Sequence, residues 1–140
     1  MRIFILSCLL VCSSVSVAQP QKEVKKQLDS LVKFIKVKHT EAFARNIAYQ
    51  GEDEKRKWKD VYNPDNPDEL RAAKQVMEEM KKAFNSCSFA EFDTFKEEKE
   101  SEGTWYIYTQ ACGAGRKIHL AFLKVKGRYV LGDIDVDSED

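Results

Sequence analysis

Two cysteines, Cys87 and Cys112, constrain the fold of this chain more than any other residues. The chain has four cysteines, and these two are the only ones beyond residue 18. They bracket a segment whose pattern is that of a β-hairpin. An antiparallel pairing centred between Lys99 and Glu100 places them opposite one another. Because the N-terminus also indicates export, the even count and the opposed positions predict a disulfide, which would fix the hairpin register.

The N-terminus has the layout of a secretory signal peptide. Arg2 supplies one positive charge, residues 3–11 are apolar, and residues 16–18 are small and suit a cleavage site. We expect residues 1–18 to be removed near Ala18, which would make the protein secreted or periplasmic. The apolar run is too short to span a bilayer, and no later stretch is long enough, so no membrane span is predicted.

Residues 19–140 are predicted to form a single domain, since about 120 residues are enough for one hydrophobic core. Removing Arg2 leaves 22 basic and 23 acidic side chains. A charge balance this close to neutral argues against a nucleic-acid partner and against a polybasic membrane anchor.

The first half of this domain has helical spacing. Apolar residues recur at helical intervals over residues 24–35, and Thr40 is expected to cap a second short helix. For a third helix, Asn66 is the expected cap, Pro67 suits the first position, and Glu69 stands where a capping-box acid would. Its apolar stripe consists of Leu70, Ala73, Met77, Met80 and Phe84.

Residues 49–65 join the second and third helices and carry many charges of both signs. One interpretation is a short hairpin of residues 47–49 against residues 58–62. The other is an irregular loop pinned by Trp58. The sequence leaves both open.

Four strands are predicted in the second half, over residues 88–96, 104–112, 116–126 and 128–136. Short turns join them, so we expect an antiparallel meander. The first strand is the weakest, because its phenylalanines repeat every three residues rather than every two.

The expected register sorts the strand residues onto two faces. We predict that the helices pack on the first face and that a symmetric partner, a ligand or the Trp58 loop covers the second, which is too aromatic for a solvated surface. The first face collects Ala90, Phe92, Trp105, Ile107, Thr109, His119, Ala121, Leu123, Val125, Val130, Ile134 and Val136. The second collects Phe89, Phe95, Tyr106, Tyr108, Ile118, Leu120, Phe122, Tyr129 and Leu131, mixed with Glu91, Asp93, Gln110, Asp133 and Asp135.

The predicted fold class is α+β, with N-terminal helices on a bent antiparallel meander of four strands, or up to six if residues 47–62 join it. This order resembles the NTF2-like or cystatin-like roll, which implies a conical pocket between a long helix and the sheet. Residues 49–53, 56–60 and 131–135 are similar to a family of small exported bacterial proteins without assigned function. Neither resemblance implies an activity.

His119 is the one candidate for catalysis, as a general base or acid near neutral pH. The competing interpretation is a buried, hydrogen-bonded histidine beside Thr109. Alternating acids at Asp133, Asp135 and Asp137 do not make a calcium loop, because Ser138 stands where a glycine is needed. We predict no metal and no cofactor.

The leading functional hypothesis is an exported, non-catalytic binding or interaction module. The expected partner is a second copy bound through the sheet face, a small apolar ligand or an envelope protein. The alternatives are an enzyme of the isomerase or dehydratase type acting through His119, and a structural envelope protein. The predicted ligand or partner contacts are Trp58, Tyr106, Tyr108, Phe122 and Tyr129.

Overall fold

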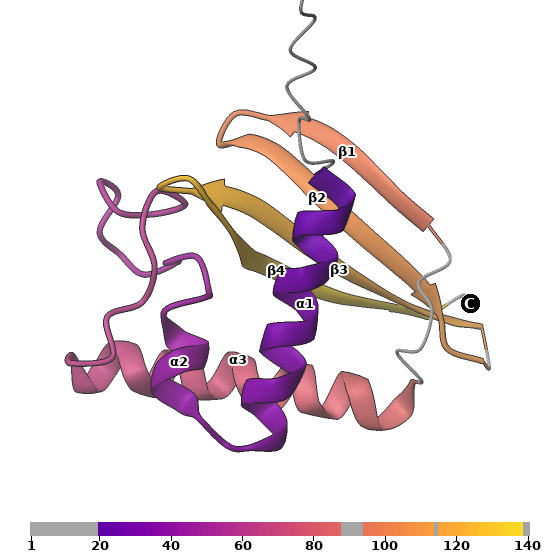
Figure 1. Cartoon of the computed structure of the whole chain (residues 1–140), viewed down its shortest axis with the longest axis horizontal. Coiled ribbons are helices and arrows are strands. Elements are labelled where there is room, and N and C mark those ends of the chain that lie inside the picture. The colour runs from indigo at the N-terminus through magenta and orange to yellow at the C-terminus, as the bar shows by residue number, and fades with distance from the viewer. Residues whose placement is uncertain (1–19, 88–93, 114, 139–140) are drawn as a thin grey trace, which may run out of the picture.

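The computed structural model describes residues 20–87, 94–113 and 115–138 (Figure 1). It shows three helices packed against a four-stranded antiparallel sheet, so the α+β class is confirmed. The predicted signal peptide and most of the predicted strand 88–96 lie outside the described residues.

The helices are α1 (Pro20–Lys36), α2 (Thr40–Ala44) and α3 (Pro67–Ser86). Helix α1 crosses in front of the sheet, and α3 runs crosswise below it (Figure 1). The buried residues of α1 recur at helical spacing, as predicted; they are Val24, Leu28, Leu31 and Ile35.

The helix caps were predicted correctly at α3 but not at α2. The Asn66 side-chain oxygen accepts the backbone N–H groups of Asp68 and Glu69, at 3.0 and 3.3 Å, and Pro67 occupies the first turn. Thr40 was expected to cap α2. Instead His39 stands at that position and makes no side-chain capping bond.

The strands are β1 (Thr94–Glu100), β2 (Gly103–Ala111), β3 (Arg116–Val125) and β4 (Arg128–Ser138). Their order in the sheet is β1-β2-β3-β4 with every pair antiparallel, which confirms the predicted meander. The first hairpin pairs Glu100 with Gly103, so it is centred between Ser101 and Glu102. The predicted centre, between residues 99 and 100, is therefore wrong.

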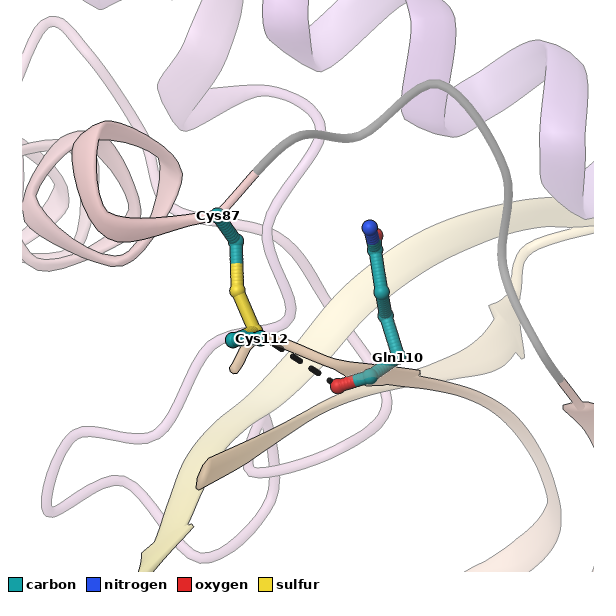
Figure 2. Close-up of a disulfide and its surroundings, with 3 residues drawn as sticks. All are labelled: Cys87, Gln110 and Cys112. Atoms are coloured by element: carbon teal, nitrogen blue, oxygen red, sulfur yellow. Dashed lines mark hydrogen bonds between the residues drawn. A yellow bond between two sulfur atoms is a disulfide. The ribbon is translucent and has the colours of Figure 1, made fainter. Parts of the chain in front are cut away.

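The cysteine pairing itself is confirmed, but Cys87 does not lie in a strand. Cys87 is the C-terminal cap of α3, and Cys112 follows directly after β2. Their Cα atoms are 5.0 Å apart, within the range of a disulfide (Figure 2). The bond thus joins the end of a helix to the end of a strand. Because it does not link two paired strand residues, it could not indicate the register of the strands.

The assignment of the two sheet faces is also wrong, because the helices pack on the second face. Tyr108, Ile118, Leu120 and Phe122 are buried in the core that contains the apolar stripe of α1. The reason is a bulge at Gly132: Leu131 pairs with Phe122 but Asp133 pairs with Ala121. The extra residue shifts the aspartates of β4 onto the outer face and leaves Ile134 facing the core.

A smaller cluster covers one end of the outer face. It consists of Ala48, Leu123, Val125 and Val130, with Trp58, Val61 and Trp105 packed against them. The backbone over residues 47–62, next to this cluster, has features of both the predicted hairpin and the predicted irregular loop. Single bridges join Ala48 to Val61 and Ile47 to Leu131, while turns occupy much of residues 51–60. The described sheet therefore has four strands and two isolated bridges.

Candidate functional site

A groove of about 500 Å³ lies between α1 and the turn that joins β3 to β4. Its volume is within the usual range for small-ligand sites. Its lining comes from one side of α1 and from the ends of two strands: Glu23, Lys26, Gln27, Ser30, Lys124, Gly127, Arg128 and Tyr129.

Local structure places these side chains together. Residues 23, 26, 27 and 30 follow the spacing of one helix face, beside the stripe that α1 buries. Lys126 and Gly127 both have positive φ, 48° and 79°, which gives a tight two-residue hairpin turn. That turn pairs Lys124 with Tyr129 across the two strands.

Tyr129 forms the aromatic part of the groove. Its ring centroid lies 5.1 Å from that of Tyr106 in a T-shaped contact, and the Lys124 Nζ lies 5.6 Å from the Tyr129 centroid. Burial raises the pKa of Tyr129, and the neighbouring Tyr106 adds to the shift. The Tyr129 hydroxyl therefore stays protonated at physiological pH.

The rim of the groove is basic, since Lys26, Lys124 and Arg128 outnumber the single acid, Glu23. Within the described residues, no carboxylate forms a salt bridge with any of these three cations. The groove therefore combines an aromatic wall with three cations that make no salt bridge to a described carboxylate, and Glu23 and Glu97 are the acids that act on its Tyr129.

The segment after α2 anchors the groove from outside. Gln27 donates to the Asn46 side-chain oxygen at 2.8 Å, and Asn46 in turn donates to the Ala42 carbonyl at 2.7 Å. Arg128 donates to the Arg45 carbonyl at 3.0 Å. These bonds connect α1 and β4 through the same short segment, so both walls of the groove have fixed positions.

The structure separates the five predicted contact residues. Tyr129 lines the groove and Tyr106 packs against it. Tyr108 and Phe122 are buried in the core, with 4% and 0% of their surface exposed, and the Tyr108 hydroxyl donates to the Gln21 carbonyl. Trp58 lies on the outer side of the sheet, in edge contact with Trp105 at 5.2 Å.

Arg56 organises the loop that contains Trp58. Its guanidinium makes two bonds to the Glu69 carboxylate, of 2.7 and 3.0 Å, and one to Asp60 of 3.0 Å. It also donates to the Val61 carbonyl and lies 4.1 Å from the centre of the Tyr49 ring. The Arg56 hydrogen bonds lower the pKa of Glu69, so this clamp is fully ionised at neutral pH.

His119 lies on the outer face of the sheet, on the side away from α1 and the groove. Its Nδ1 is 2.8 Å from the Thr109 hydroxyl oxygen, and its Nε2 is 3.0 Å from the Asp137 carboxylate. The prediction that His119 shares a face with the core is wrong, because that face is the outer one. The neighbouring hollow, about 290 Å³, also contains Asp133 and Asp135.

Comparisons of the chain with protein-family models, with curated proteins and with solved structures found no match. In the described part of the chain, no helix is both long and apolar enough to cross a membrane. Among the same residues, no three His, Cys, Asp or Glu side chains gather in a way that could hold a metal ion.

Proposed function

We propose that this protein is an exported binding module that holds a small ligand in the groove between α1 and the β3–β4 turn. The observation that carries this proposal is the groove itself: a concave site with one aromatic wall and several polar groups directed at the same space. A pocket between a long helix and a bent sheet is also what the resemblance to the NTF2-like or cystatin-like roll implies.

Binding without catalysis fits the residues of this groove best. Among the residues that the structure describes, its lining contains no imidazole or thiol, and the Ser30 hydroxyl donates to the Lys26 carbonyl rather than lying beside a base. His119, the candidate base, is on the opposite face of the sheet. The enzyme alternative would therefore need a separate site there.

The expectation of a dimer through an aromatic sheet face loses its basis, because α1 and the rest of the protein's own core cover that face. Export remains part of the proposal, and the disulfide is compatible with an oxidising compartment. N-terminal sequencing of the protein after expression with its first eighteen residues would test the export signal.

The binding proposal can be tested by mapping a diverse fragment library onto the purified protein with two-dimensional NMR. We expect amide shifts to concentrate at residues 23–30 and 124–129. Ser30→Trp should abolish these shifts, because a large ring on that side of α1 fills the groove. Lys33→Trp is the matched control, since it places the same ring on an exposed position of the same helix.

Three outcomes would contradict the proposal. The library could produce no shifts at the groove, or shifts concentrated around His119 and Asp135 on the outer face. The third is groove binding that survives Ser30→Trp as well as it survives Lys33→Trp. Native mass spectrometry of the protein as purified provides an independent check for a retained small molecule.

A further inference from the structure

We infer that the ligand of this groove is a small anion with a flat apolar ring, such as an aromatic carboxylate. This inference rests on the proposed function, because it assigns a ligand class to the same site. Three features support it: the charges of the lining, the aromatic wall formed by Tyr129 and the anchoring of the two walls.

The charges favour an anion. Lys26, Lys124 and Arg128 line the groove against one carboxylate, Glu23. Two of the three cations are lysines that make no salt bridge with any carboxylate in the described ranges, while Lys25, the neighbour of Lys26, is paired with Asp29 at 2.5 Å. A bound anion would gain electrostatic interactions with ammonium groups that no described carboxylate pairs with.

The aromatic wall favours a ring over a simple inorganic anion. Tyr129 is half-buried, and Tyr106 supports its ring from one side in the T-shaped contact. The Lys124 ammonium lies near the same ring. A flat ligand that packs against Tyr129 therefore brings its charged substituent close to Lys124, so one ligand satisfies both features.

The cations come from both walls of the groove. Lys26 belongs to α1, whereas Lys124 and Arg128 belong to the strand ends across the groove. An anionic group placed between the two walls meets a cation from each. Because Gln27 and Arg128 are both bonded to the segment 45–46, the two walls of the groove and the Arg128 guanidinium are held near their positions before the ligand arrives.

The test uses 2-naphthoate and 2-naphthamide, two probes of nearly the same shape that differ in charge. NMR titration of the purified protein should show that the carboxylate binds at residues 23–30 and 124–129 roughly tenfold more tightly than the amide. Its affinity should also fall as NaCl rises from ~20 to ~200 mM, because salt screens partly exposed charges.

Charge-removing variants identify the groups responsible. Lys26→Gln and Lys124→Gln should each weaken naphthoate binding by roughly threefold to tenfold. Lys74→Gln, which removes an exposed charge from α3, should leave the affinity unchanged. A variant effect on naphthoate without an effect on naphthamide would support the assignment of these lysines to the anionic group.

Equal binding of the two probes, or equal affinity in Lys26→Gln, Lys124→Gln and Lys74→Gln, would overturn the ligand class. Failure of both probes to shift groove amides would overturn it as well. In each case a fragment that maps to the groove and is lost in Ser30→Trp would leave the proposed function standing, so the two failures can be told apart.

Discussion

Replacing Arg56 with glutamine should destabilise the protein more than any other single charge removal on the loop between α2 and α3. The substitution removes both bonds to Glu69, the bond to Asp60, the bond to the Val61 carbonyl and the contact with the Tyr49 ring. It also leaves the Glu69 carboxylate, which is only 13% exposed, without its cation.

The expected loss lies between two known limits. Exposed ion pairs contribute about 0–1 kcal/mol, whereas removing one partner of a fully buried pair costs about 3–5 kcal/mol. Arg56 is 28% exposed, so solvent screens part of its interaction with Glu69. We therefore expect Arg56→Gln to lower the free energy of unfolding by about 2–3 kcal/mol. For a domain of this size that corresponds to a fall in Tm of roughly 8–12 °C.

Urea denaturation followed by circular dichroism measures this loss, and the chain provides a matched control. Arg71 forms an i,i+3 pair with Asp68 at 2.9 Å, but the two side chains are 71% and 84% exposed. Arg71→Gln should therefore change stability by less than about 0.5 kcal/mol. In a double-mutant cycle, Arg56→Gln and Glu69→Gln together should cost less than the sum of the two single changes. A loss below about 0.5 kcal/mol for Arg56→Gln, or strict additivity, would refute the clamp.

Acidification, a buried glycine and the disulfide give three more expected results. The Lys126 ammonium lowers the pKa of Asp60 to about 2. The stability that this carboxylate adds above about pH 4 is therefore lost as the pH falls through 2. Urea unfolding should show that the free energy of unfolding differs less between pH 7 and pH 3 in Asp60→Asn than in the parent protein. Gly132→Ala should lower stability by about 1–3 kcal/mol in thermal melts, because the added methyl group overlaps the indole ring of Trp105 and comes within 2.8 Å of a Leu123 methyl carbon. Replacing Cys87 and Cys112 with serine should lower stability by about 3–4 kcal/mol, as expected for a closed loop of 25 residues, and an unchanged urea midpoint would contradict this.

Local signals in the sequence predicted the elements of the fold well. Asn66 and Pro67 fix the start of α3 because side-chain capping and a fixed φ act within a few residues. The short turns of the sheet imply antiparallel neighbours for the same reason, since a turn of two residues cannot join strands in any other way. The disulfide prediction combined the cysteine count and the expected export with opposed positions in a hairpin; the pair is present, but that hairpin register was wrong.

The choice of the core face failed because it depended on one bulge. Without it, Asp133 and Asp135 fall on the face of Tyr108 and Phe122, and that face looks too polar to be the core. With the extra residue at Gly132, the aspartates turn outward and Ile134, opposite Leu120, joins the apolar residues of the aromatic face. A glycine within a strand pattern is the signal that could have indicated the bulge.

The groove and the Arg56 clamp were not predictable from local pattern, because each depends on residues far apart in the chain. Lys26 and Lys124 are almost a hundred residues apart, and neither stands out in a chain with 23 basic side chains. Arg56 differs from the lysines around it by its planar guanidinium, which favours two-point contact with a carboxylate. That preference suggests a partner but does not identify Glu69.

The two ends of α3 show why the groove can be expected to keep its shape. At its N-terminal end, Glu69 is bonded to Arg56; at its C-terminal end, Cys87 is bonded to Cys112 beside β2. Helix α1 shares one core with α3 and the sheet, so a shift of α1 would expose the apolar stripe that it buries. The walls of the groove are α1 and the sheet itself. A ligand therefore meets two walls whose positions the core has already set, and its affinity depends on how well its own charge and ring match the side chains on them.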